Sequence, residues 1–246
     1  MSRNFELLQQ IDREEELFPA PIPAAVSGNG HRPRFDLGEL SREERMKLVQ
    51  RLFILPGPEA PHAVMFCGVD TGVGSSWVCA RASETLASQV KTSVCVVDAN
   101  LRQPFLHEHF RTDNLYGLTD AVFESGPIRS FAKQLNGGNL WLITCGSRTT
   151  DPHTLLTSDR LRSSISELAA EFDYVLLNGP PVNLYVDATL LGKVTEGVVL
   201  VLQANSTRRE TARKAKESLE SAKVRVLGAV LNDRTFPIPE FLYRHM

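Results

Sequence analysis

Six short apolar runs, separated by stretches with helical spacing, constrain the fold of this chain more than any other feature. Their hydrophobicity is continuous, which is typical of strands buried on both faces of a parallel sheet. The sequence therefore predicts an α/β fold: a doubly wound, mostly parallel sheet with helices on both faces and its ligand site at the carboxyl ends of the strands. The runs are residues 63–67, 94–98, 140–144, 174–178, 198–202 and 226–232. Helices are expected to begin at Ser76, near Leu118, at Pro127, near Ser158, near Val186 and near Thr207.

The residues before the first run predict two short helices and a linker. Residues 1–18 carry apolar side chains at roughly helical spacing, whereas residues 19–34 are rich in proline and glycine and favour a linker. Ser41 followed by Glu44 fits a capping box for a second helix. We therefore divide the chain into an N-terminal amphipathic helix with its linker, residues 1–35, and an α/β domain, residues 36–246. We expect the first helix to dock on a partner or a neighbouring subunit.

Composition excludes several classes of function. A formal net charge of -2 and an isoelectric point near 6.3 give no electrostatic reason to expect nucleic-acid binding. No apolar run approaches the ~20 residues that cross a bilayer, so we expect a cytoplasmic protein that meets a membrane only through a partner. The four cysteines have irregular spacing and are interpreted as reduced core thiols, and the histidines show no spacing typical of a zinc site.

A glycine-rich turn follows the first apolar run directly. Residues 68–76 read Gly-Val-Asp-Thr-Gly-Val-Gly-Ser-Ser, and a helical pattern continues from Trp77. Glycine adopts backbone angles that other residues resist, and the amides from Gly72 to Ser76 would point at an anion on the helix N-terminus. The turn therefore indicates a phosphate-binding loop. An ordinary tight turn between a strand and a helix is the simpler alternative.

Co-linear segments across roughly residues 39–232 resemble the bacterial tyrosine kinases of capsular and exopolysaccharide biosynthesis. These kinases belong to the deviant P-loop ATPases, which also include chromosome-partition and septum-site proteins. Residues 94–104, VCVVDANLRQP, resemble the family's second acidic motif, with Asp98, Asn100 and Arg102 at its three characteristic positions. Residues 172–182 resemble the strand that ends in a magnesium-organising aspartate. Further matches follow in the family's order at residues 151–161, 187–210 and 226–233.

The chain departs from the family pattern at three positions. Ser75 stands where the loop lysine is expected, Asn100 replaces the second acidic residue, and Asn178 replaces the third-strand aspartate. Each change removes a charge that phosphoryl transfer uses. The loss of the lysine alone is worth about 10- to 100-fold in nucleotide affinity, and missing transition-state contacts are costlier. We therefore expect ATP or ADP with Mg²⁺ to bind weakly and catalysis to suffer more than binding.

The resemblance also implies roles for individual residues, and each has a simpler alternative. Ser76 matches a magnesium ligand but also fits a helix cap, and Asp98 matches a catalytic and metal-binding carboxylate but also fits a cap for residues 101–109. Arg102 matches a catalytic arginine or is a solvent-facing helix residue. Asn232 matches the residue that contacts adenine or forms an Asx turn. The implied nucleotide-binding residues are Gly72, Val73, Gly74, Ser75, Ser76 and Asn232.

The sequence thus leads to one principal function and two alternatives. The first is a pseudokinase that acts as a regulator or scaffold in exopolysaccharide synthesis and export, peripheral at the inner membrane. The resemblance implies a membrane-embedded chain-length determinant as partner, together with self-association or an active kinase paralogue. The second is an active ATP-dependent tyrosine autokinase that recruits Lys47, Lys91 or Lys193. The third is a partition- or placement-type ATPase.

Overall fold

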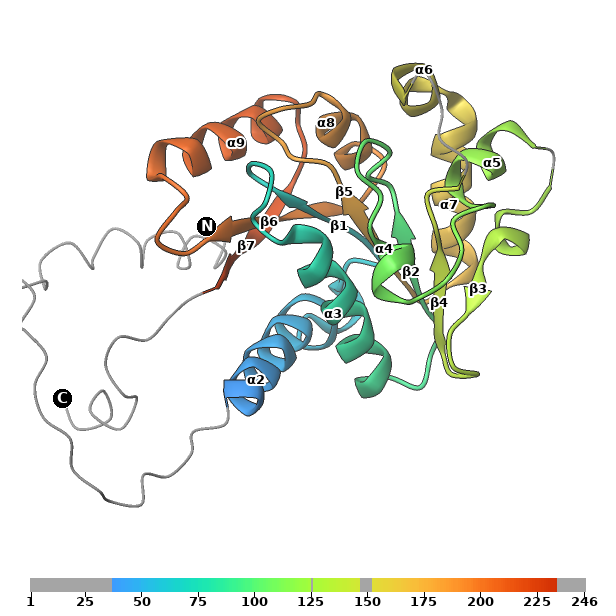
Figure 1. Ribbon diagram of the computed structural model, residues 1–246, viewed down its shortest axis with the longest axis horizontal. Helices are drawn as coiled ribbons and strands as arrows, with labels where there is room; N and C mark the ends of the chain where they lie inside the picture. The colour runs from blue at the N-terminus through green and yellow to red at the C-terminus, as the bar shows by residue number, and fades with distance from the viewer. Residues whose placement is uncertain (1–36, 125, 147–151, 234–246) are drawn as a thin grey trace, which may run out of the picture.

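The computed structural model describes residues 37–124, 126–146 and 152–233, and every structural statement below concerns those residues. The helix and linker expected in residues 1–35 lie outside the described residues. All six predicted strands form, and the predicted fold class is confirmed: a seven-stranded sheet runs in the order β3-β4-β2-β5-β1-β6-β7 (Figure 1). The strands are β1 (Ala63–Gly68), β2 (Val94–Asp98), β3 (Lys133–Gln134), β4 (Leu140–Ile143), β5 (Tyr174–Gly179), β6 (Gly197–Gln203) and β7 (Val226–Asn232).

The strand β3 is the one antiparallel member among the described strands, and the sequence did not predict it. It contains only Lys133 and Gln134, which pair with Leu142 and Trp141 of β4. Two polar residues offer no apolar run to recognise. The other neighbouring strands are parallel, so their carboxyl ends meet at one edge of the sheet.

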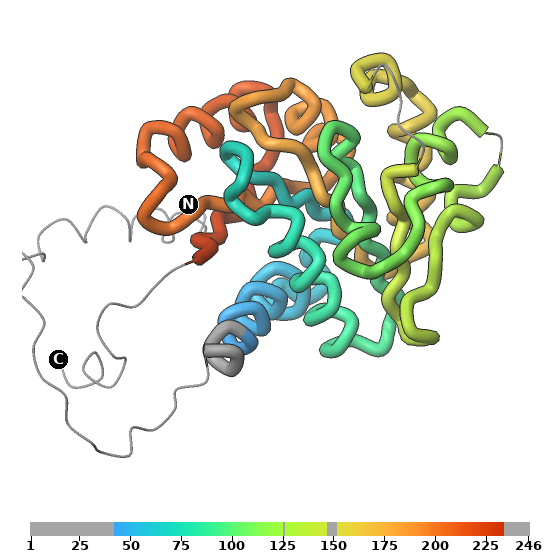
Figure 2. The backbone as a smooth tube through the Cα atoms, viewed as in Figure 1, coloured from blue at the N-terminus to red at the C-terminus, as the bar shows by residue number. Residues whose placement is uncertain are grey.

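Helices cover both faces of the sheet. The helices α2 and α3 lie on one side, and α8 and α9 lie on the other (Figures 1 and 2). This division follows from right-handed crossovers, since the chain moves one way across the sheet after β1 and the other way after β4. The helices are α2 (Leu37–Val49), α3 (Ser75–Gln89), α4 (Leu106–His109), α5 (Leu118–Phe123), α6 (Pro152–Thr157), α7 (Asp159–Glu171), α8 (Asp187–Gly192) and α9 (Arg209–Ser221).

Two helix predictions need correction. The helix α2 begins at Leu37, four residues before Ser41, so Ser41 lies inside the helix and the predicted N-cap is wrong. A short π-helical turn, η3 (Gln50–Ile54), continues this segment to the expected end before Pro56. The helix predicted at Pro127 is only a 3₁₀ turn, η5 (Ile128–Phe131), with Pro127 as its N-cap.

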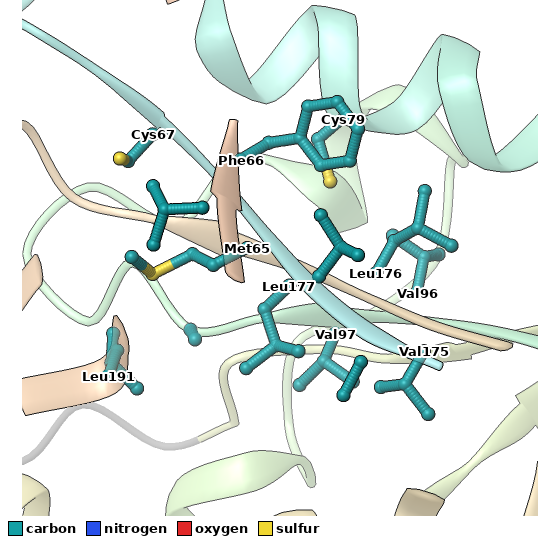
Figure 3. Packing of buried hydrophobic residues seen from close by; sticks show 14 of the residues in the cluster. Met65, Phe66, Cys67, Cys79, Val96, Val97, Val175, Leu176, Leu177 and Leu191 are labelled. Atoms are coloured by element: carbon teal, nitrogen blue, oxygen red, sulfur yellow. The ribbon is translucent and has the colours of Figure 1, made fainter. Parts of the chain in front are cut away.

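The register of the central strands places the site residues on the α3 face of the sheet. Phe66 of β1 pairs with Asn178 of β5, which pairs with Asp98 of β2, so the three side chains share one face. Figure 3 shows Phe66 beside Cys79 of α3, while Met65 and Leu177 point to the opposite side, toward Leu191 of α8. All six residues of β1 are buried, as the continuous hydrophobicity of the run predicted.

Asp173, just before β5, is hydrogen-bonded to Ser93, just before β2, at the amino edge of the sheet. These bonds predict that Asp173 contributes to stability in a pH-dependent way. Its Oδ2 accepts the backbone N–H and the hydroxyl of Ser93 at 2.8 and 2.7 Å, and these bonds lower the pKa of Asp173. A carboxyl with a lowered folded pKa stabilises the fold above its unfolded pKa of about 4, and this contribution is lost as the pH falls through the folded value.

We therefore expect Asp173→Asn to lower the free energy of unfolding at pH 7 by about 1 kcal/mol, since the carboxylate is exposed to screening water. The difference from the wild type should shrink as the pH falls below about 4. Urea denaturation at pH 7 and pH 3 measures this, with Ser93→Ala as the matched loss of the partner hydroxyl. A difference of equal size at both pH values would contradict the assignment.

Candidate functional site

The glycine-rich turn between β1 and α3 has the backbone of a phosphate-binding loop. Gly72 and Gly74 adopt φ angles of 77° and 80°, in the left-handed region that favours glycine. Gly74 is the N-cap of α3, which begins at Ser75. A Cβ on Gly74 would collide with the side-chain amide of Asn232, so both the backbone angle and the available space require glycine here. The glycine at position 74 therefore permits the close contact between the turn and Asn232.

The first turn of α3 offers unpaired amides to an anion. The amide of Val78 donates to the carbonyl of Gly74 at 3.0 Å, and the helix has no internal acceptor for the amides that precede it. These amides also lie at the positive end of the helix dipole. Thr71 and Gly72 are exposed, whereas Ser75 and Ser76 are half-buried. This arrangement is the one expected of a phosphate-binding loop, and Ser75 adds no positive charge to it.

Two of the three lysines considered as replacements lie far from the loop. Lys91 sits between α3 and β2, and Lys193 follows α8 and precedes β6, so both are at the amino edge of the sheet. Lys47, in the last turn of α2, forms an ion pair with Glu44 at 2.7 Å. The phosphate-binding loop lies at the carboxyl edge. Lys91 and Lys193 therefore cannot supply its missing charge within one chain.

The side chain of Asn232, at the end of β7, is hydrogen-bonded to the glycine-rich loop. Its side-chain Nδ2 donates to the carbonyl of Val73 at 3.1 Å. Its backbone carbonyl accepts the amide of Ala204 at 2.8 Å, which ties β7 to the end of β6. Neither expectation for Asn232, a contact with adenine or an Asx turn, included this bond. The structure thus places Asn232 at the expected site, bonded to the loop itself.

Asp98 is a fully buried carboxylate whose two oxygens both accept hydrogen bonds. Oδ2 accepts the amides of Phe105 and Leu106, each at 2.8 Å. Oδ1 accepts Nδ2 of Asn178 at 2.9 Å and the amide of Asn100 at 3.4 Å. Burial raises the pKa of Asp98, and these four bonds oppose that rise because they favour the ionised form. Asp98 thus caps α4, which begins at Leu106, five residues later than the expected segment 101–109.

The residues around Asp98 do not fit a magnesium ion as they stand. Mg²⁺ requires nearly octahedral coordination by oxygen atoms with free lone pairs. The Asp98 oxygens already accept four N–H groups, and Asn178 is neutral. The Oδ1 of Asn178 is buried without a hydrogen-bond partner in the described part of the chain, and Oδ1 of Asn100 accepts the amide of Gln103 at 3.2 Å. The oxygens left to bind the ion would then be the hydroxyl of Ser76 and Oδ1 of Asn178, both neutral.

Arg102 lies in the loop between β2 and α4, not on a helix. Its Nε and Nη2 donate to the carboxylate of Asp187 at 2.7 and 3.3 Å. Its guanidinium carbon lies 4.3 Å from the ring centroid of Tyr185, a cation–π distance. The side chain of Asp187 is 2% exposed and that of Arg102 is 35% exposed, and the hydrogen bond that Arg102 donates to Asp187 raises the pKa of Arg102. Sequence reasoning missed Tyr185 and Asp187, because 85 residues separate Asp187 from its partner.

The remaining expectations concern thiols, metals and membranes. All four cysteines are free and buried, and burial raises the pKa of Cys67, Cys79 and Cys95, so these groups remain thiols. Within the described ranges, no cluster of three or more His, Cys, Asp or Glu side chains is arranged to hold a metal ion. In the same part of the chain, no helix is long and apolar enough to cross a membrane.

Comparisons with solved structures agree on the fold. The chimerical protein CapA2B2 matches with a TM-score of 0.73 and 24% identity, covering 79% of this chain and 85% of that one. The kinase domain of the Escherichia coli tyrosine kinase ETK matches with a TM-score of 0.72 and 22% identity, covering 80% and 79%. The septum site-determining protein MinD of Pyrococcus horikoshii, solved with Mg-ADP, is more distant, with a TM-score of 0.58 and 19% identity over 74% and 76% of the two chains. These identities are low, so the structures establish the fold alone.

Sequence comparison establishes the family. No family model matches the chain. The tyrosine-protein kinase YwqD of Bacillus subtilis is 33% identical over 172 residues, which make up 70% of this chain and 72% of YwqD. The tyrosine-protein kinase Wzc of Salmonella typhi is 28% identical over 171 residues, 70% of this chain but 24% of that longer protein. The chain therefore belongs to the bacterial tyrosine-protein kinases.

Proposed function

We propose that this chain is a degenerate member of its family that acts as a regulator or scaffold in exopolysaccharide synthesis and export, with weak or absent nucleotide binding. One observation carries the proposal: the carboxylate of Asp98 is held by four N–H donors, and its neighbour on β5 is the neutral Asn178. The acidic group left in the motif is thus engaged inside the protein. It is not free to hold a metal ion or to accept a proton from a substrate.

The glycine-rich loop gives a second line of support for the same proposal. Its backbone keeps both left-handed glycines and the clamp from Asn232, so a phosphate can still be received. Ser75 removes the lysine that would neutralise the β- and γ-phosphates. Such a site retains the geometry for binding and lacks the charges for transfer. Residual, weak nucleotide binding without efficient turnover is the expected result.

A specific observation also favours the second function, an active ATP-dependent tyrosine autokinase. The intact loop backbone would serve a nucleotide fully if another subunit or a partner supplied a cation beside Ser75. A partition- or placement-type ATPase receives less support, because the structural neighbours of that class fit less closely than the kinase domains do.

The proposed partners follow from the family relationship. A membrane-embedded chain-length determinant is the first, and a second copy of the chain or an active kinase paralogue is the next. The proposed location is cytoplasmic, at the inner membrane through the partner. Co-purification of the full chain with a membrane-embedded chain-length determinant from the same organism would test this assignment.

Calorimetric titration of the purified full chain with ATP or ADP tests the proposed nucleotide behaviour. We expect affinities about 10- to 100-fold weaker than those of YwqD measured in parallel, because the lysine contact is missing. Magnesium should add little, since Asn100 and Asn178 replace acidic ligands. Incubation with labelled ATP should produce no phosphotyrosine. Micromolar, magnesium-dependent affinity together with autophosphorylation would contradict the proposal and favour the active kinase.

A further inference from the structure

The carboxyl ends of β2 and β5 meet in a polar contact between one carboxylate and one neutral amide. Asp98 and Asn178 are partners in the strand register, and both side chains are fully buried. Nδ2 of Asn178 donates to Oδ1 of Asp98 at 2.9 Å. Two carboxylates at these positions would repel each other unless a cation or a proton lay between them. An amide at position 178 removes that requirement because it donates a hydrogen bond to the single remaining charge.

The bonds of Asp98 continue into the following segment. Its second oxygen accepts the amides of Phe105 and Leu106, so the end of the segment 99–106 is fixed to β2. Arg102, in the middle of the same segment, is fixed by Asp187 and Tyr185. The segment 99–106 is therefore held at two points. Its end is bonded to Asp98, which is itself bonded to β5, and its middle is bonded to residues that follow β5.

The unpartnered oxygen of Asn178 is explained by the same contact. An amide side chain presents an N–H₂ group on one side and an oxygen on the other. The opposite orientation would place Oδ1 against the Asp98 carboxylate, where two acceptors repel. Donation to Asp98 therefore leaves Oδ1 buried and unpaired. The unpaired Oδ1 of Asn178 is thus a consequence of the hydrogen bond between Nδ2 of Asn178 and the Asp98 carboxylate.

We propose that Asn178 is a positioning residue that takes the place of a divalent cation, holding Asp98 and thereby the segment 99–106 in one arrangement without metal. The inference does not rest on the proposed function, because it concerns this segment whether or not the chain turns over nucleotide. Its consequence is that the surface carrying Arg102 and Tyr185 keeps the same conformation in the presence and absence of magnesium. A partner that contacts this surface would bind independently of the nucleotide state.

Hydrogen exchange at the amides of Phe105 and Leu106 tests the proposal in the full chain. In the wild type, exchange at both amides should be equally slow in EDTA and in magnesium chloride. In Asn178→Asp, exchange in EDTA should be about 10- to 100-fold faster, the factor that corresponds to one hydrogen bond to a charged group. Magnesium chloride should then restore part of the protection, because a cation can lie between the two carboxylates.

Asn136→Asp is the matched control, since it makes the same chemical change at an exposed turn. It should leave both amides as slow as in the wild type. Three results would overturn the proposal: magnesium protection in the wild type, full protection of Asn178→Asp in EDTA, or a loss that magnesium does not reduce. If Asn178→Asp does not fold, Asn178→Ala replaces it. That variant should expose the two amides equally in EDTA and magnesium, and unchanged protection would equally overturn the assignment.

Discussion

Ser75→Lys is expected to tighten ATP binding by about 10- to 100-fold. A lysine at this position would add one charge-assisted hydrogen bond to a phosphate, a contact worth about 1.5 to 3 kcal/mol. The loop has the left-handed angles at Gly72 and Gly74, and Asn232 holds the carbonyl of Val73, so we expect its backbone to accommodate the contact. The gain in affinity should therefore not be reduced by a cost of rearranging the backbone. Calorimetric titration of both proteins under one set of conditions measures it.

Thr71→Lys is the matched control for this prediction. It adds the same charge to an exposed position of the same loop, where it strengthens only the general attraction for phosphate. A gain confined to Ser75→Lys identifies the loop as a phosphate cradle. Equal gains in the two variants, or no gain in either, would mean that it is not one. Phosphotyrosine formation should remain absent in Ser75→Lys, because Asn100 and Asn178 still lack the charges that hold a metal ion.

The sequence predicted the elements whose residues lie close together along the chain. Continuous apolar runs identified all six parallel strands. Burial on both faces explains the runs of the central strands β1, β2, β5 and β6, whereas β7 lies at the edge of the sheet and is only half-buried despite its apolar run. The glycine-rich turn was equally visible, since Gly72 and Gly74 are needed for local backbone angles. What the sequence could not supply was the partner of each polar side chain. The fold brings together residues that spacing along the chain does not relate.

Asp98 and Arg102 illustrate this difference. Asp98 was predicted at the carboxyl end of a strand, the place where parallel sheets gather their polar groups, and it ends β2. Arg102 was matched to the family motif or to a helix, and it lies in the loop that follows β2. Their actual partners, Asn178 and Asp187, are 80 and 85 residues away, and no local pattern connects them. Arg102 matched either a catalytic residue or a solvated helix position in the sequence, whereas the structure pairs it with a buried carboxylate.

Arg102→Ala is expected to lower the free energy of unfolding by about 2 to 3 kcal/mol. The change leaves the carboxylate of Asp187, which is 2% exposed, buried without its cation. Removing one partner of a buried ion pair typically costs 3 to 5 kcal/mol, and about a third of the Arg102 side chain meets water, which reduces the loss. For a domain of this size the melting temperature should fall by roughly 4 to 12 °C. Thermal denaturation of the full chain at neutral pH measures the change.

Companion variants separate the buried charge from the other contacts of the arginine. Adding Asp187→Asn to Arg102→Ala should recover part of the lost stability, because the double variant buries no unpaired carboxylate. Arg102→Lys should fall between the wild type and the alanine variant, since an ammonium keeps the charge but loses the two-pronged bond to Asp187 and the planar contact with Tyr185. If Arg102→Ala melts within about 1 °C of the wild type, the pair does not stabilise the fold, and Arg102 becomes available again for the catalytic role that its place in the motif implies.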